Sequence, residues 1–420
     1  MVAGLTVLVA KLGLMALGSL LSWLALAGRL PVPAIRAQLT AIFGFRWTVL
    51  VVAYGFFGFP LTGDVQGFEI HARWILEGRI PGRDFGSPYG LLFNAMIAAA
   101  VWLTGDGRGI VVAAQLVEFA ASLLFIKAAS ARLGEERGRL ASFVLLLNPL
   151  LISAFWFDGQ DESLIFLSVA VVVALTLSPG NGRAVALTVG LSLLLLKPTA
   201  CVFIAPALLY CSLAERIWAI SIPAGGFLAL HACGLSAANL RFEKADGTFD
   251  DFSQLRMPGN PWFLLEKFGV VDAPPAVSLG LTGLALTVIG LWLVHRARDR
   301  AAGPQDVTFP VVMTAGSFQF LAPYSTPAAF AAAAPAMALA AVEARSSKVA
   351  SALFCGWWFL AGIDVPIMFR LPALRSRFPA VDTDLLFLIG DVVVVLVSAA
   401  GLLALGRTML TRKAHAAKVT

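Results

Sequence analysis

Long apolar runs fill most of this chain, and they decide what it can fold into. The hydrocarbon core of a bilayer requires about 20 apolar residues per spanning helix. Hydrophobic residues make up 59% of the 420 residues and charged residues only 13%, which excludes a soluble globular domain and a disordered chain. We predict an all-α polytopic membrane protein with about 12–13 transmembrane helices. They are expected at residues 3–27, 41–61, 110–130, 140–156, 163–178, 184–197, 198–214, 217–236, 277–295, 308–321, 327–343, 349–364 and 385–406.

The distribution of charge sets the expected topology, because cytoplasmic loops collect Lys and Arg. If the apolar run Leu91–Thr104 crossed the membrane, the acid-rich segment 156–162 would face the cytoplasm. We therefore predict a juxtamembrane or re-entrant piece at 91–104. The chain then begins outside and ends in a basic cytoplasmic tail. The net charge of +6 belongs to the inner loops, among which we count Arg46, and does not indicate nucleic acid.

The first apolar run, 3–27, resembles a signal peptide because it ends in Ala25-Leu26-Ala27. No basic residue precedes Lys11, however, so the usual positively charged start is missing and we expect a retained helix. The chain contains no strand–helix alternation and no glycine-rich phosphate loop, which excludes a nucleotide-binding domain. Its four cysteines lack metal-ligand spacing and are expected to pack in the interior.

The first charged segment after two apolar runs carries four acids, Asp64, Glu69, Glu77 and Asp84. Residues 64–77 are expected to form a helix whose N-cap is Asp64. One interpretation is an amphipathic helix on the membrane surface, with Asp64 as its cap and Glu69 in a solvated pair with Arg73. The other uses the position of Asp64 at a membrane boundary, where partial desolvation favours a carboxylate as a proton acceptor.

Two phrases in this segment carry a family resemblance. They are Gly63-Asp64 followed by Arg79-Ile80-Pro81-Gly82-Arg83-Asp84-Phe85, and Ser87-Pro88-Tyr89-Gly90-Leu91-Leu92. Further along come Leu147-Asn148-Pro149-Leu150, Asp158-Gly159-Gln160-Asp161-Glu162-Ser163, Lys197-Pro198 and, more faintly, Ala322-Pro323-Tyr324-Ser325. These motifs resemble those of the GT-C-type integral membrane glycosyltransferases in their order along the chain and in lying on the same predicted side of the membrane. That family uses polyprenyl-phosphate sugars and includes bacterial enzymes and the mannosyltransferase of GPI-anchor synthesis. The similarity covers roughly residues 63–206. Gly82 replaces the usual tyrosine, and Ser-Pro-Tyr-Gly stands where Tyr-Pro-Pro is commoner.

The resemblance implies that Asp64 takes the proton of an acceptor hydroxyl while the sugar leaves its lipid phosphate with inversion. Asp84 either assists Asp64, binds a divalent cation with it, or caps a turn before Pro88. No cofactor is certain beyond that cation. Substrate contacts are expected from Tyr89, Asp158, Gln160, Asp161, Lys197, Arg370, Arg375 and Arg377. Asp161 serves equally well as the cap of a helix.

The leaving phosphate needs cations at the outer surface. Lys197 is the first candidate, because a lysine between two apolar runs is costly unless it is functional or reaches the interface. The arginines of the last outer loop, Arg370, Arg375 and Arg377, either bind phosphate oxygens or meet lipid headgroups. His71 shares a helix face with Asp64 and is expected to be structural rather than a metal ligand. Trp262 and Phe263 are expected to anchor the long outer loop at the membrane interface.

The expected organisation has five parts. They are an extra N-terminal helix with a basic inner loop (1–40), a GT-C-like catalytic module (41–236) with outer loop 62–109, a long outer loop (237–276), C-terminal helices (277–406) and a basic tail (407–420). We expect the active site on the outer face of a bacterial inner membrane and the C-terminus in the cytoplasm. The donor is a polyprenyl-phosphate sugar (mannose or arabinose-like), and the acceptor is a lipid, glycan or protein. 

A polyprenyl- or glycolipid flippase is the alternative. It would use Glu118, Asp391 and Lys197 as a polar route through the membrane, since ionisable residues inside apolar runs are expensive and are usually paired or functional. No internal repeat of the kind that many transporters carry is evident in the sequence. The resemblance favours the enzyme.

Overall fold

The computed structural model describes most of the 420 residues. They are 2–56, 58, 61, 63–155, 162–177, 180–197, 199–233, 235, 241–251, 257–270, 282–283, 286, 289–290, 305–322, 330–345, 347–368 and 371–416. Nearly all of them are helical, which confirms the all-α prediction.

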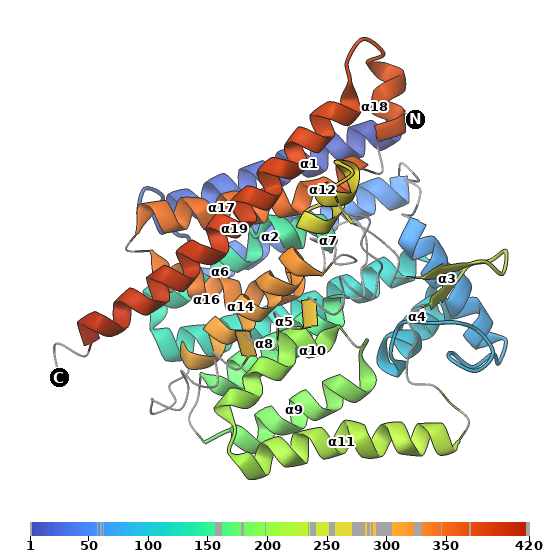
Figure 1. Ribbon diagram of the computed structural model, residues 1–420, viewed down its shortest axis with the longest axis horizontal. Helices are drawn as coiled ribbons and strands as arrows, with labels where there is room; N and C mark the ends of the chain where they lie inside the picture. Colours follow the sequence, from blue (N-terminus) through green and yellow to red (C-terminus); the bar gives the residue numbers. More distant parts are fainter. Residues whose placement is uncertain are drawn as a thin grey trace.

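The chain folds as a bundle of helices with one small hairpin (Figure 1). The N-terminal helices are α1 (Val2–Leu26), α2 (Ile35–Leu50) continued by the π-helix η1 (Val51–Phe56), α3 (Gly63–Leu76), α4 (Leu91–Thr104), α5 (Arg108–Leu133), α6 (Glu135–Leu146), α7 (Pro149–Ala154), α8 (Glu162–Thr176), α9 (Gly182–Leu195), α10 (Ala200–Ile204), η2 (Ala205–Tyr210) and α11 (Leu213–Ala232). The C-terminal half holds β1 (Arg241–Glu243), β2 (Phe249–Asp251), α12 (Pro261–Lys267), α14 (Gln305–Leu321), η3 (Ala331–Ala333), α16 (Ala334–Ala344), α17 (Lys348–Met368), α18 (Leu371–Arg377) and α19 (Thr383–Ala416).

The centre of the bundle is formed by α5, α6, α8 and α16, which pack against one another. Phe125, Phe155 and Phe166 fill this core and are fully buried. Every described side chain of α16 from Ala334 to Val342 is buried, and most are alanines. Small side chains allow membrane helices to approach closely, because dispersion contacts rather than expulsion of water drive their association. The core is therefore built on close backbone packing around a few aromatic rings.

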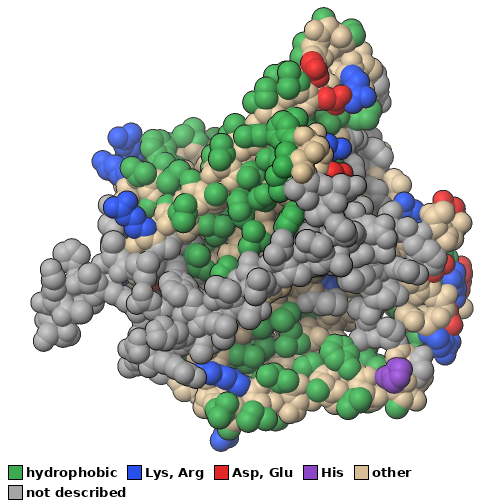
Figure 2. Space-filling model, in the orientation of Figure 1, with side chains coloured by type: hydrophobic (Ala, Val, Ile, Leu, Met, Phe, Trp, Pro, Cys, Tyr) green, Lys and Arg blue, Asp and Glu red, His purple; other side chains and the backbone are tan. Residues whose placement is uncertain are grey.

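Six described helices are long and apolar enough to cross a membrane: Leu8–Leu26, Ile35–Phe56, Arg108–Leu133, Glu135–Ala154, Leu213–Ala232 and Thr383–Ala404. Large hydrophobic side chains of α11 and α19 are exposed, for example Leu228 at 72% and Leu396 at 63%. Figure 2 shows hydrophobic side chains between the two ends of the molecule and charged ones gathered at those ends. Such an apolar belt is the surface that lipid covers, so the chain is a multi-pass membrane protein.

The two ends of the bundle carry different parts of the chain. The N-terminus, α18, α3 and the hairpin lie at one end in Figure 1, and the C-terminus lies at the other.

The predicted helices are present wherever the structure describes them, with two differences. Residues 198–214 do not form one membrane-length helix, because α10 and the 3₁₀ turn η2 together span only 200–210. The predicted helix 140–156 is divided between α6 and α7, where the side chain of Asn148 accepts a hydrogen bond from the Leu150 amide at 2.9 Å and Pro149 opens the second helix. The predicted helix 277–295 lies almost entirely outside the described residues.

Residues 91–104, predicted as a juxtamembrane or re-entrant piece, form the separate short helix α4. Its 14 residues reach only about 21 Å, less than the hydrocarbon thickness of a bilayer. It packs against α3 and α5, and it ends at Gly105, whose φ of 85° places it in the left-handed region. Trp102 and Leu103 near this end are more than two-thirds exposed, which suits a helix lying at the membrane surface.

Arg46 does not lie in a cytoplasmic loop, contrary to the sequence prediction. It is inside α2, with its side chain 2% exposed, and it forms an ion pair with Glu118 of α5, which is 1% exposed. Its guanidinium also lies over the ring of Phe43. A charge in the apolar interior requires such a partner. The pair explains why an acid interrupts the apolar run of α5.

The second intramembrane acid, Asp391 of α19, holds the long outer loop. Its buried carboxylate accepts a hydrogen bond from the Gly259 amide at 2.6 Å, immediately before α12. In α12, Trp262 donates to the Leu321 carbonyl at 2.7 Å and Phe263 is buried. These aromatic residues therefore fix α12 to the bundle, whereas we had predicted an anchor at the lipid interface.

Candidate functional site

Helix α3 carries Asp64 at its first turn and buries one face. Val65, Phe68, His71 and Ala72 are at most 1% exposed, whereas the side chain of Asp64 is exposed. The expected sharing of one face by Asp64, Phe68 and His71 therefore holds for the last two only. Asp64 lies in the first turn of α3 with its side chain exposed.

Glu69 and Arg73 attach α3 to the connection between α4 and α5. Arg73 donates to Glu69 at 2.6 Å and to the Gly105 carbonyl at 3.0 Å. The other carboxylate oxygen of Glu69 accepts from the Gly107 amide at 2.9 Å. The predicted Glu69–Arg73 pair is confirmed, and it also closes the α4–α5 turn. The helix that carries Asp64 is thus braced at its middle.

The hairpin β1–β2 covers the buried face of α3, beside which it lies in Figure 1. The ring of Phe242 stacks on that of His71 with centroids 4.3 Å apart. A Cβ at Gly67 would come 2.7 Å from the Phe242 ring, so this close contact requires a glycine. The amide of Gly86 donates to the Glu243 carboxylate at 2.9 Å. Two segments that are distant in sequence are therefore joined here, and no spacing or motif indicated it.

His71 holds the centre of this contact in its neutral form. Its Nε2 donates to the Glu243 carbonyl at 2.8 Å, and its ring lies between Phe242 and Trp74. Burial lowers the pKa of His71, the nearby Arg79 acts in the same direction, and the hydrogen bond and charge of Glu243 oppose them. These contacts give His71 a structural role.

Asp84 is held in a tight turn. One of its oxygens accepts from the Ile80 amide at 2.8 Å, and both accept from the Arg83 guanidinium at 2.9 Å. Hydrogen bonds from Arg83 and then Ile80 lower the pKa of Asp84 to about 2. A carboxylate with so low a pKa is a weak proton acceptor, so the geometry favours the turn role among the predicted alternatives.

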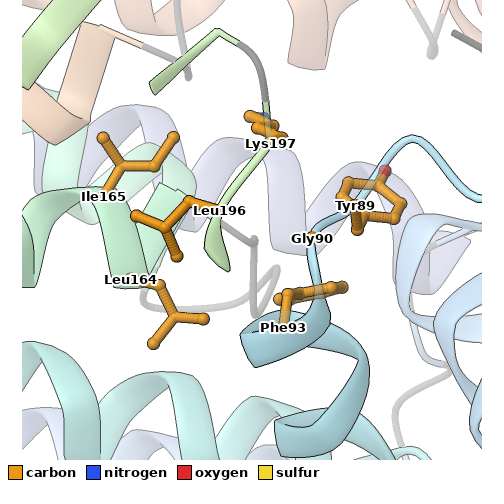
Figure 3. A pocket seen from close by; sticks show the side chains of 7 residues that line it. All are labelled: Tyr89, Gly90, Phe93, Leu164, Ile165, Leu196 and Lys197. Carbon is orange, nitrogen blue, oxygen red and sulfur yellow. The ribbon is translucent and has the colours of Figure 1, made fainter. Parts of the chain in front are cut away.

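Tyr89 and Lys197, two predicted substrate contacts, meet at one small pocket. Its walls come from α4, the start of α8 and the end of α9 (Figure 3), and the lining residues are Tyr89, Gly90, Phe93, Leu164, Ile165, Leu196 and Lys197. Lys197 is the one charged residue among them. In Figure 3, Tyr89 and Lys197 lie on the same side of the pocket, with Phe93 and Leu164 below. An ammonium beside apolar walls suits an anionic head on an apolar chain.

Gly90 brings the two walls of this pocket together. A Cβ on Gly90 would lie 2.6 Å from the carbonyl carbon of Leu195 and 2.7 Å from that of Leu196. Real Cβ atoms do not approach backbone so closely, so only glycine fits here. Asn94 secures the same loop by donating to the Tyr89 carbonyl at 2.9 Å. Gly90 therefore fixes where Tyr89 stands relative to Lys197.

Lys197 also forms an ion pair with Glu162, the first residue of α8. Its Nζ lies 2.6 Å from Oε1 of Glu162, with the two side chains 17% and 7% exposed. The sequence indicated Lys197 through its cost between two apolar runs. From the sequence, Glu162 either helps to orient the donor sugar or acceptor or caps the following helix, and its pairing with Lys197 came from the tertiary structure.

The remaining predicted residues do not join this pocket where the structure describes them. Arg375 of α18 is exposed and binds the carboxylate of Asp384 at 2.6 Å, and Arg377 is exposed at the end of the same helix. Helix α18 contacts α19 and lies apart from α3 and α4 in Figure 1. The other four, Asp158, Gln160, Asp161 and Arg370, lie outside the described residues.

The described residues do not form a cation site. No group of three or more His, Cys, Asp or Glu side chains among them is arranged to hold a metal ion. Both carboxylate oxygens of Asp84 are already engaged by Arg83 and Ile80.

Comparison with known proteins identifies the fold. No protein-family model and no curated protein sequence matches the chain. Among solved structures, it is similar to the crystal structure of ArnT from Cupriavidus metallidurans bound to undecaprenyl phosphate. The two share 13% sequence identity with a TM-score of 0.50, over 92% of this chain and 80% of ArnT. This chain has the GT-C fold. The GT-C similarity thus extends well beyond residues 63–206, where the sequence motifs lie.

Proposed function

We propose that this protein is a membrane glycosyltransferase that moves a sugar from a polyprenyl-phosphate donor to an acceptor hydroxyl. The observation that carries the proposal is the pocket of Tyr89 and Lys197, in which one ammonium stands beside apolar walls. A GT-C fold supports the same reading, since the similar ArnT structure is bound to undecaprenyl phosphate. The polyprenyl chain would lie along the apolar surface and its phosphate would meet Lys197.

Asp64 is the proposed general base. It removes the proton of the acceptor hydroxyl, whose oxygen attacks the anomeric carbon. The bond from that carbon to the phosphate oxygen breaks, and its electron pair stays with the lipid phosphate. Attack opposite the leaving group inverts the anomeric configuration. The braced helix α3 supports this role, because it holds an exposed carboxylate at a fixed place beside the outer segments. The rest of the rate enhancement would come from positioning the two substrates and from stabilising the charge that develops in the transition state.

We propose the outer face of a bacterial inner membrane as the site of transfer. The acid-rich segments and α3 lie at one end of the bundle and the C-terminus at the other, and basic residues of the C-terminal tail suit the cytoplasm. We propose a mannose-like or arabinose-like sugar as the transferred group and a lipid, glycan or protein as the acceptor. The transporter alternative gains no support, because Glu118, Asp391 and Lys197 each bind a different partner: Arg46, Gly259 and Glu162.

The test is transfer of radiolabelled sugar from extracted polyprenyl-phosphate sugars to membrane lipids by the purified protein. The variant Asp64→Asn should lower transfer by about 10²–10⁴-fold, the usual contribution of a general base. Glu77→Gln is the matched control, since Glu77 is an exposed acid at the other end of α3. No transfer from any donor by the unchanged protein would overturn the function. Equal transfer by Asp64→Asn would overturn the assignment of the base.

A further inference from the structure

The ion pair between Lys197 and Glu162 places a carboxylate where the donor phosphate is expected to bind. The two charged groups are 2.6 Å apart and largely withdrawn from solvent. The pocket beside them has a volume of about 10 Å³, room for a single water molecule. A phosphate that binds Lys197 here meets an ammonium already paired with the Glu162 carboxylate.

The donor and the product of the proposed reaction differ in charge at this position. A sugar linked to a polyprenyl phosphate is a phosphodiester with one negative charge. The lipid that remains after transfer is a phosphomonoester, which carries roughly −1.5 to −2 at neutral pH. A lysine alone would bind the product more tightly than the donor, because attraction grows with charge. An enzyme with such a site would be strongly inhibited by its own product.

We propose that Glu162 is a positioning residue that competes with the lipid phosphate for Lys197 and so favours release of the product. This inference rests on the proposed function. A carboxylate close to the ammonium repels a doubly charged phosphate more strongly than a singly charged one. Its return to Lys197 also leaves no unpaired buried charge when the product departs, and an unpaired charge would be costly. Glu162 would then reduce the difference in affinity by which the site favours the phosphomonoester product over the phosphodiester donor.

The pocket geometry supports competition between the two anions rather than simultaneous binding. Gly90 holds the opposite wall against Leu195 and Leu196 by backbone contact, so that wall is closely packed. Leu164, Ile165 and Phe93 are buried and apolar, and Tyr89 is the other polar side chain among the lining residues. Lys197 is the one cation lining the pocket.

The experiment measures binding of decaprenyl monophosphate to the purified full-length protein in detergent micelles, with decaprenol as the uncharged probe. Glu162→Gln should tighten binding of the monophosphate by about tenfold, equivalent to about 1.4 kcal/mol, and leave decaprenol binding unchanged. In a transfer assay the same variant should show stronger inhibition by added decaprenyl monophosphate. Glu77→Gln, which removes an exposed acid of α3, should change neither value.

Lys197→Met removes the ammonium paired with the buried Glu162 carboxylate and is expected to lower the stability of the protein. The double variant Glu162→Gln with Lys197→Met avoids this problem and should lose the gain in affinity. Unchanged or weaker monophosphate binding by Glu162→Gln, in a protein whose unchanged form binds the probe, would overturn the role of Glu162. Binding of decaprenyl monophosphate no tighter than decaprenol by the unchanged protein would instead contradict the proposed donor class.

Discussion

The imidazole ring of His71 and the phenyl ring of Phe242 lie face to face, with centroids 4.3 Å apart and planes inclined by 22°. One belongs to the helix that carries Asp64 and the other to the hairpin β1–β2. The contact therefore joins two segments that are far apart in the sequence. The following predictions concern this contact, the pocket and the buried charges.

Phe242→Ala should release the hairpin from α3. The ring fills the space over Gly67 and contacts the rings of Phe68, His71 and Tyr89, so its loss should cost about 2–4 kcal/mol. Hydrogen exchange of the backbone amides of residues 241–251 measures this release, and their protection should fall. Phe378→Ala, which removes an exposed ring beyond α18, should leave the protection unchanged. Full protection in Phe242→Ala would contradict the prediction.

The same contact should weaken in acid. Burial lowers the pKa of His71 below its ordinary value of 6.5, so the undocked state binds more protons than the docked state as the pH falls. The stabilisation from His71 is thus complete above pH 6.5 and is lost progressively below it. Glu243 and Arg79 are the charged groups that face the ring. Exchange of residues 241–251, corrected for the intrinsic rate at each pH, should increase in acid. His71→Phe keeps a stacked ring and should abolish this dependence, whereas its persistence would implicate another group.

Gly90→Ala should impair donor binding while leaving most of the bundle intact. The added methyl group would overlap the backbone of Leu195 and Leu196, so the loop of Tyr89 has to move away from Lys197. We expect a loss of at least tenfold in kcat/KM for the lipid donor, or about 1.4 kcal/mol. Gly44→Ala in α2 is the matched control because its Cβ meets nothing within 4 Å. An unchanged kcat/KM in Gly90→Ala would contradict the prediction and show that the backbone of Leu195 and Leu196 moves to accommodate the methyl group.

The buried pair of Arg46 and Glu118 should matter more for stability than any exposed pair. Arg46→Ala leaves a carboxylate uncompensated in the apolar interior, which should cost about 3–5 kcal/mol. Replacing both residues, with Arg46→Met and Glu118→Leu, should recover most of this loss. Thermal unfolding in detergent measures the effect. Asp384→Asn breaks the exposed pair with Arg375 and should cost less than about 1 kcal/mol. A double variant as unstable as Arg46→Ala would show that the charges themselves are required.

Asp84→Asn should affect transfer far less than Asp64→Asn does. Because Arg83 and Ile80 lower the pKa of Asp84 to about 2, its carboxylate contributes to the turn above its ordinary pKa of 3.8 and loses that contribution as the pH falls toward 2. The amide keeps one acceptor for the Ile80 amide, so we expect a loss of about fivefold or less in transfer, against about 10²–10⁴-fold for a base. A loss as large as that of Asp64→Asn would place Asp84 in the chemistry.

The helices and the general class of this protein follow from the sequence. In lipid, every backbone polar group has to be satisfied within its own segment, so a long apolar run has essentially one structure available. From the charge distribution we predict a juxtamembrane or re-entrant piece at 91–104, where the structure has the short helix α4. The order of Asp64, Asn148-Pro149 and Lys197 along the chain was enough to indicate the GT-C fold that the comparison then showed.

The partners of individual polar residues were decided by the tertiary structure. Arg46 reads as a loop charge in the sequence, yet it lies beside Glu118 in the core. Lys197 reads as a lone cation, yet Glu162 stands 2.6 Å from it. The apolar pattern of a helix specifies which face is buried but not which neighbour covers it. Each of these pairs depends on how helices or loops far apart in the chain come into contact, and that is set by packing across the whole bundle.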